Sequence, residues 1–427
     1  MHLRTIPESN TKYALISFDP KGQERHDDPD CSMSELILEL VASGEFSNVF
    51  WFSHGWMGDV PEAIRQYDLW IGAFDALRAT RNVPDFKPLY VGIHWPSRPW
   101  GDENLRGTSF AASQSISLDD LTAGYLDRLG ETPGTQAAVR TILDEARKHA
   151  AADTLSSRAR EALLLLDAEL GLTAGPDADG IPFDPDAMFE DAEAASFGGI
   201  GDGLMDVLRR MSYWSMKKRA RKIGENALHP FLNRLQQATA GPATPIHLMG
   251  HSFGCVVISA AIGGPAAAAP LVRPIDSVAL VQGAVSLWSY ASAAPGNVPG
   301  YFHPVIRDNK IRGPLVVTRS RHDKAVNKPY EMASRVSNQV SFVPADYPKF
   351  GAIGRFGLQG LPESRCVDAP MLTACESYNF ECGKIYNLES SKFICKMDGF
   401  SGAHNDIGGP EVANAIWEAA FASIRQR

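Results

Sequence analysis

A serine flanked by glycines, between two apolar runs, is the feature of this 427-residue chain that most constrains its fold. Residues 246–249 (Ile-His-Leu-Met) have the length and composition of a short buried strand, and residues 255–262 (Cys-Val-Val-Ile-Ser-Ala-Ala-Ile) those of a buried helix. The five residues 250–254, Gly-His-Ser-Phe-Gly, join the two runs. A strand that turns this sharply into a helix exposes the Ser252 hydroxyl, and side chains at positions 250 or 254 would obstruct the close passage of strand and helix.

Other apolar runs predict more strands of the same sheet, separated by helical patterns. A βαβ alternation of this kind is typical of a doubly wound, mostly parallel sheet, so the predicted fold class is α/β. Pro230 is expected to break or kink the helix that precedes the serine strand. The predicted strands are 13–18, 48–52, 88–94, 245–249, 277–281 and 315–318, and the predicted helices of the alternation include 61–79 and 410–424.

Two stretches interrupt the alternation. Residues 98–213 combine helical patterns with a glycine- and proline-rich segment and are predicted to form a partly helical insertion, cap-like or lid-like, before the serine strand. Residues 327–383 are predicted to form a second, irregular insertion. The remaining core would consist of 1–97 and 214–427, with the second insertion inside it.

The segments 13–97, 245–326 and 384–424, about half of the chain, resemble the α/β-hydrolase superfamily. Gly-His-Ser-Phe-Gly is similar to the nucleophile elbow of lipases and esterases, and 214–224 is similar to a helix that precedes the elbow in uncharacterised bacterial members. The resemblance implies an α/β-hydrolase sheet and a serine nucleophile, Ser252.

A serine hydroxyl is weakly acidic and needs a general base, which in turn needs an orienting carboxylate. The superfamily presents them in the chain order serine, acid, histidine. Asp323 follows the strand 315–318, and His404, which precedes the last helix, is the only histidine after Asp323. The predicted triad is therefore Ser252, Asp323 and His404. Alternative acids are Asp276, Asp308 and Asp406.

An oxyanion needs two backbone N–H donors. Phe253 supplies the first, and the resemblance of Ser53-His54-Gly55-Trp56 to the His-Gly loop of the superfamily implies Trp56 as the second, with Met57 as the fallback. His54 as a second base is the weaker alternative to a role in bracing this loop. Candidates for lining the substrate pocket are Met57, Trp95, Trp288 and Phe302, for which core packing is an equal alternative.

Composition excludes several classes of protein. With 44% hydrophobic and 21% charged residues, the chain can bury a full core. A net charge of -9 argues against nucleic-acid binding, so the basic run at 217–222 is predicted to be a solvated helix face. No stretch approaches about 20 apolar residues and no signal peptide is seen, which predicts no membrane span and a cytoplasmic location.

Four of the six cysteines, Cys366, Cys375, Cys382 and Cys395, lie within thirty residues. Their spacing lacks the pairs of common zinc sites. Separate reduced thiols are favoured over two local disulfides or a zinc site.

The sequence thus predicts a serine hydrolase that cleaves carboxylic esters, of a small molecule or a lipid, through an acyl-enzyme and without a metal or organic cofactor. A thioesterase, an acyltransferase or a peptidase would use the same triad. An alternative of another class is a scaffold or effector protein whose insertion binds a protein partner or a membrane surface.

Overall fold

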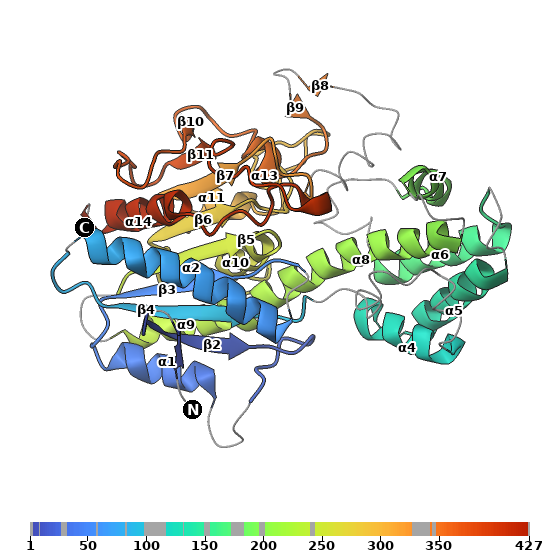
Figure 1. The fold of residues 1–427 in the computed structure, drawn as a ribbon, viewed down its shortest axis with the longest axis horizontal. Helices are drawn as coiled ribbons and strands as arrows, with labels where there is room; N and C mark the ends of the chain where they lie inside the picture. The colour runs from blue at the N-terminus through green and yellow to red at the C-terminus, as the bar shows by residue number, and fades with distance from the viewer. Residues whose placement is uncertain are drawn as a thin grey trace. The chain divides into compact units, whose positions relative to one another are not determined.

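The chain folds around a nine-stranded sheet with helices on both faces, an α/β architecture (Figure 1). The structure is a computed structural model that describes residues 3–7, 9–26, 32–56, 59–81, 83–97, 117–130, 132–148, 154–171, 183–195, 201–239, 244–326, 342–343 and 347–425. The strand order is β1-β2-β4-β3-β5-β6-β7-β11-β10, and every neighbouring pair is parallel except β1 and β2. The strands are β1 (Arg4–Thr5), β2 (Lys12–Ser17), β3 (Asn48–Ser53), β4 (Pro88–His94), β5 (Ile246–His251), β6 (Ser277–Val281), β7 (Leu315–Arg319), β10 (Cys366–Pro370) and β11 (Ile385–Glu389).

Both faces of the central strands are buried, because successive side chains of a strand point to opposite faces and helices cover each. The Phe50 ring of β3 packs on Phe74 of α2, with ring centroids 4.7 Å apart. The neighbouring Trp51 stacks on Phe231 of α9, on the other side of the sheet, at 5.3 Å. The first face carries α2 (Val60–Arg81) and α14 (Pro410–Arg425), and the second carries α1 (Met33–Ala42), α9 (His229–Ala238) and α10 (Gly254–Gly263).

The six strands predicted from the sequence are confirmed as β2 to β7, and the two helices as α2 and α14. Pro230 is predicted to break or kink the helix, and the structure has a π-helical turn before it rather than a break, since the flanking residues Ile223, Leu228 and His229 are all right-handed helical. α8 (Gly201–Ile223) passes into a π-helical turn, η2 (Gly224–Leu228), and Pro230 lies in the first turn of α9, where no N–H is needed. A Cβ atom on Gly224 would lie 2.4 Å from the carbonyl oxygen of Val257, so glycine lets this turn pack closely on α10.

By compactness the chain divides into two units. The first comprises Met1–Ser97, Arg219–Lys328 and Gly351–Arg427, and contains the sheet together with the short helices α11 (His303–Arg307) and α13 (Ile353–Phe356) and the 3-10 turn η3 (Gly399–Ser401). The second comprises Arg98–Lys218 and Pro329–Phe350. Its helices and hairpin are α4 (Leu118–Leu129), α5 (Pro133–Lys148), α6 (Ser157–Leu170), α7 (Pro185–Ala195), most of α8, and the strand pair β8 (Phe342–Val343) and β9 (Tyr347–Pro348).

The segment 327–383, predicted as an irregular insertion, contains a strand of the main sheet. Residues Cys366–Pro370 form β10, which pairs in parallel with β11 at the edge of the sheet, where Figure 1 labels the two strands. Its side chains are exposed or half-buried, as an edge strand allows, so it carries no apolar run by which the sequence would reveal it. The described cysteines are free thiols and form no disulfide with one another, as favoured from their spacing.

The prediction of a solvated basic face at 217–222 holds for the exposed Lys222 but is wrong for Lys217 and Arg221. Lys217 is buried with its ammonium over the ring of Trp214, at 5.7 Å from the ring centroid. Arg221 is largely buried as well, paired with Glu225 at 3.0 Å and lying over the ring of Tyr301. Long basic side chains bury their stems and stack on aromatic rings, which a count of charges does not reveal. None of the described helices is long and apolar enough to cross a membrane.

Candidate active site

Ser252 lies at the turn between β5 and α10 with a left-handed backbone, at a φ of 55°. A residue other than glycine adopts this conformation only where the surroundings enforce it. Here the Ser252 N–H donates to Val281 on the adjacent strand β6 at 3.2 Å, and the Ser252 carbonyl accepts from Cys255 and Ala284, each at 3.1 Å. The backbone of the serine is thus fixed from its own helix and from β6.

Three glycines make room for this turn. A Cβ atom on Gly250 would lie 2.4 Å from the carbonyl oxygen of Gly254, and one on Gly254 would lie 2.1 Å from the carbonyl oxygen of Ser53. A Cβ atom on Gly55 would lie 2.5 Å from the Cβ of Ser252. The first two positions are those at which the sequence predicted that side chains would obstruct the turn. The Gly55 contact also brings the loop after β3 against the serine.

Asp323 and His404 form a buried pair. His404 Nδ1 lies 2.8 Å from Asp323 Oδ2, and because a carboxylate accepts, Nδ1 carries the proton and the lone pair of the neutral ring lies on Nε2. Asp323 follows β7 and is completely buried, and His404 is 7% exposed before α14. A bridge between Asp323 and Gly402 and a hydrogen bond from the Ala403 N–H to the His322 carbonyl, at 2.9 Å, join the two loops.

His251, which precedes Ser252, connects the serine turn to the loop of His404. Its Nε2 donates to the His404 carbonyl at 3.0 Å, and the two rings lie 4.8 Å apart. The Trp70 ring also packs on His251 in a T-shaped arrangement, with ring centroids 5.5 Å apart. Burial lowers the pKa of His251 well below its ordinary value, so the ring is neutral. Among the described residues no hydrogen bond joins the Ser252 hydroxyl to His404. Catalytic hydrogen bonds of this kind are often long before substrate binds.

His54 braces the loop after β3. Its Nδ1 lies 2.8 Å from the Gly55 carbonyl and therefore carries the proton, which leaves Nε2 to accept from His94 Nδ1 at 3.1 Å and from the Trp95 N–H at 3.3 Å. The Trp95 ring stacks on the His54 ring at 5.6 Å. Burial, followed by the nearby His94, lowers the pKa of His54 to about 3. A ring held neutral between fixed partners supports the bracing role rather than that of a second base.

Tyr67 of α2 holds the same loop through two hydrogen bonds of its hydroxyl group. Its hydroxyl accepts from the His54 N–H at 3.0 Å and donates to the Ile93 carbonyl of β4. A Cβ atom on Gly92 would lie 2.7 Å from the Tyr67 ring, so a glycine at this position of β4 leaves room for the ring. Nothing in the sequence pattern singled out Tyr67, which is one of several residues on the buried face of α2.

Of the two predicted oxyanion donors, Phe253 is buried at the start of α10, and its ring lies 6.2 Å from that of Trp56. The fallback, Met57, lies outside the described residues. Phe253 follows Ser252 in the turn, and Trp56 follows Gly55, the glycine that lies against Ser252.

The predicted pocket residues occupy different surroundings. Trp95 is completely buried and its indole N–H donates to the His54 carbonyl at 3.0 Å. Phe302 is buried against Tyr290, with ring centroids 5.7 Å apart, and Trp288 is half-buried. Their part in binding substrate stays a prediction.

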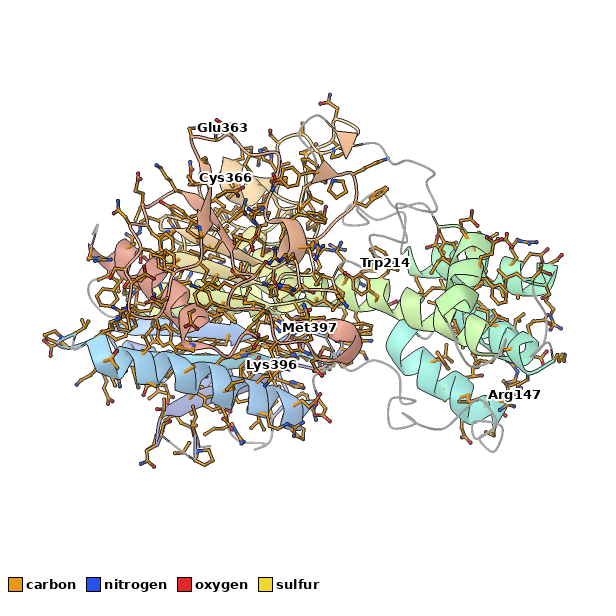
Figure 2. All side chains as sticks on the ribbon, turned by 45° about the horizontal axis from the view of Figure 1, so that its top comes forward. Arg147, Trp214, Glu363, Cys366, Lys396 and Met397 are labelled. Atoms are coloured by element: carbon orange, nitrogen blue, oxygen red, sulfur yellow. The ribbon has the colours of Figure 1, made fainter. Side chains whose placement is uncertain are left out.

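The three alternative acids have other partners. Asp276 is completely buried and paired with Arg273, at 2.8 Å, and with Arg312. Asp308 is paired with the adjacent Arg307 at 2.7 Å. Asp406 accepts from the N–H groups of Cys395 and Lys396, on the loop that Figure 2 marks with Lys396 and Met397. Only Asp323, of the four, is hydrogen-bonded to His404 within the described part of the chain.

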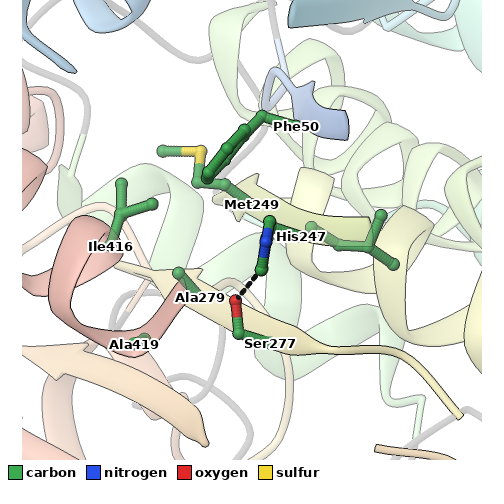
Figure 3. A pocket seen from close by; sticks show the side chains of 8 residues that line it. Phe50, His247, Met249, Ser277, Ala279, Ile416 and Ala419 are labelled. Carbon is green, nitrogen blue, oxygen red and sulfur yellow. Dashed lines mark hydrogen bonds between the residues drawn. The ribbon is translucent and has the colours of Figure 1, made fainter. Parts of the chain in front are cut away.

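Neither a small gap in the core nor the acidic, histidine and cysteine side chains of the described residues form a further binding site. The gap in Figure 3, lined by residues such as Phe50, His247 and Ile416, has no room for a water molecule and lies between the strands and α14. It is a packing defect of the core. Across the described ranges, no three His, Cys, Asp or Glu side chains are grouped so as to hold a metal ion.

The steric role of the glycines predicts the effect of adding one methyl group. Gly254→Ala should destabilise the protein by at least about 3 kcal/mol, because the new Cβ would overlap backbone that is fixed on both sides. Gly72→Ala is the matched control, since this helical glycine of α2 has open space around it and its replacement should be neutral or stabilising by up to about 1 kcal/mol. Urea unfolding measures both. Equal stability of Gly254→Ala and the wild type would contradict the close approach.

Acid should destabilise the protein through its buried histidines. Burial lowers the pKa of His54 to about 3 and that of His94 to about 4, and lowers that of His251 as well, whereas the unfolded rings titrate near 6.5. Below that pH the unfolded chain binds protons that the native chain does not, so stability is lost as the pH falls from about 6.5. Each such histidine contributes up to about 1.4 kcal/mol per pH unit.

The measurement is the free energy of urea unfolding between pH 7 and pH 5. His54→Gln should reduce the slope by about one proton, and the exposed His26→Gln should leave it unchanged. Stability that is constant or rises as the pH falls through this range would show that these rings are not held neutral.

The arrangement provides a strained serine, a histidine hydrogen-bonded to a buried carboxylate and a braced loop, which are the kinds of group that nucleophilic attack on a carbonyl requires. No family model, curated protein or solved structure matches the chain.

Proposed function

We propose that the chain is a serine hydrolase of the α/β-hydrolase type, which cleaves carboxylic esters through an acyl-enzyme on Ser252. The observation that carries the proposal is the buried Asp323–His404 pair, joined through His251 to a serine with a left-handed backbone. A loop carboxylate and a loop histidine have no structural need to be buried together, and a strained serine persists only where its surroundings maintain it.

The architecture supports the same proposal. Ser252 follows β5, in the middle of the parallel sheet, while Asp323 follows β7 and His404 precedes α14. The carboxyl ends of parallel strands lie at one edge of the sheet, where α/β proteins place their sites. The chain order serine, acid, histidine and the strand-turn-helix around Ser252 are those of the superfamily that the sequence resembles.

In the proposed reaction, Ser252 Oγ attacks the acyl carbon and its proton passes to His404 Nε2. Asp323 holds the ring and stabilises the imidazolium that forms. The Phe253 and Trp56 N–H groups donate to the oxyanion, and His404 returns the proton to the departing alcohol. Water then attacks the acyl-enzyme by the same route, with His404 first accepting a proton from the water and then giving it to Ser252 Oγ, which releases the carboxylic acid.

The substrate of this proposal is an ester of a small molecule or a lipid. Thioesters and amides are attacked by the same groups and are distinguished by assay rather than by the triad. The scaffold alternative requires neither a strained serine nor a buried acid–histidine pair, so the geometry favours an enzyme. Neither a metal nor an organic cofactor takes part in the proposed steps.

Covalent labelling tests the nucleophile. A fluorophosphonate should label the wild type at one serine and should not label Ser252→Ala, because only a serine with an adjacent base reacts quickly with phosphorus. Ser43→Ala, which removes an exposed hydroxyl at the end of α1, is the control and should be labelled like the wild type. Equal labelling of wild type and Ser252→Ala would overturn the assignment. Hydrolysis of esters and thioesters of increasing acyl length would then define the substrate class.

A further inference from the structure

Gln282 is a completely buried polar residue at the end of β6, a strand that is otherwise mostly apolar. Its backbone is left-handed, at a φ of 44°, and its N–H donates to Thr318 Oγ1 of β7 at 3.0 Å. A buried amide in an unfavourable backbone conformation persists only where its neighbours maintain it, and such residues gather at functional sites.

The neighbours of the side chain fix the orientation of its amide. One end of the amide faces the Gly354 carbonyl at 2.9 Å and Asp323 Oδ2 at 2.8 Å, and the other faces Thr318 Oγ1 at 3.2 Å. Carbonyl and carboxylate oxygens only accept, so the nitrogen must face Gly354 and Asp323, and the amide oxygen accepts from the Thr318 hydroxyl. With the opposite orientation, the amide oxygen would meet two acceptors in a site without water contact.

We propose that Gln282 is a positioning residue that orients the Asp323 carboxylate toward His404, an inference that rests on the proposed function. Asp323 Oδ2 receives two hydrogen bonds of 2.8 Å, one from Gln282 and one from His404, while Oδ1 receives the Val326 N–H at 3.3 Å. Donors on both oxygens fix the plane of the carboxylate. The direction of its hydrogen bond to His404, and hence the direction in which Nε2 points, follows from that plane.

Apart from His404, the groups that hydrogen-bond to the Asp323 carboxylate in the described structure are neutral donors, so neutral groups must fix its orientation. His404 is its only ion-pair partner in the part of the chain that the structure describes. Gly354 of α13 completes the enclosure, because a Cβ atom there would lie 2.8 Å from the Gln282 carbonyl carbon and 3.1 Å from Asp323 Oδ2. Glycine thus lets α13 close over the amide and the carboxylate together. Thr318 of β7, Asp323 of the loop after β7 and Gly354 of α13 each contribute one contact that holds the amide in place.

The test compares Gln282→Leu, which removes both donors at similar size, with Gln359→Leu as the matched control. Gln359 donates to the Phe356 carbonyl at 2.8 Å and has no part in the site. With a short p-nitrophenyl ester, Gln282→Leu should lower kcat by about 10- to 100-fold at an unchanged KM, by analogy with the loss of a hydrogen-bond partner behind a metal ligand. The control should keep the kcat of the wild type.

A second readout does not need activity. In proton NMR spectra, the Nδ1–H of His404 in its bond to Asp323 should give a low-field resonance that shifts or disappears in Gln282→Leu and persists in Gln359→Leu. A purely structural role of Gln282 would lower stability and leave both this resonance and kcat in the folded fraction as they are.

Gln282→Glu carries the test if Gln282→Leu does not fold. Asp323 and His404 are the titratable groups that this side chain faces or adjoins, while Thr318 and Gly354 bring no charge. Two adjacent carboxylates repel each other, so the introduced carboxyl group takes up a proton readily as the pH falls and then restores one donor to Asp323. The kcat of Gln282→Glu relative to wild type should therefore rise as the pH falls.

The outcomes separate the two proposals. Wild-type kcat and an unchanged resonance in Gln282→Leu, or a constant ratio in Gln282→Glu, would overturn the positioning role and leave the hydrolase proposal intact. If the wild type hydrolyses no ester, the proposed function fails, and the resonance still decides whether Gln282 orients the Asp323–His404 pair.

Discussion

The close passage of three backbone segments at Ser252 is the constraint on which the rest of the site depends. β5, the start of α10 and the loop after β3 approach within distances that exclude a Cβ atom at positions 250, 254 and 55. This approach holds the serine in its left-handed conformation and places the His54-Gly55-Trp56 loop beside it. Both the proposed nucleophile and the loop proposed to bind the oxyanion therefore depend on the same absence of side chains.

Burial distinguishes among the histidines gathered here. His54, His94 and His251 all have a pKa lowered mainly by burial, so they are neutral hydrogen-bonding groups. Of these histidines and His404, only His404 is hydrogen-bonded to a carboxylate in the described structure, that of Asp323. A positive charge formed during a reaction would be stabilised on that ring alone, which is why the role of base belongs to His404 in the proposed mechanism.

The sequence predicted those parts of the molecule that have a local signal. Apolar runs revealed β2 to β7, and the glycines around Ser252 revealed the turn. β10 and β11 were missed because neither forms an uninterrupted apolar run. β10 is an edge strand with exposed and half-buried residues, and β11 has the buried polar residue Asn387 at its centre. Gln282 and Tyr67 were missed for a different reason: their partners, Asp323 and the His54 N–H, are 41 and 13 residues away, and only the folded chain brings them together.

The most direct test of the central claim is the identification of the acylated residue. A p-nitrophenyl N-alkylcarbamate forms a carbamoyl-enzyme that water hydrolyses slowly, so the covalent intermediate accumulates and its site can be located by peptide mass spectrometry. Acylation through the proposed mechanism predicts a carbamoyl group on Ser252, in a stoichiometry that approaches one per chain. Turnover of esters with the carbamoyl group on another residue, or with none on Ser252, would contradict it.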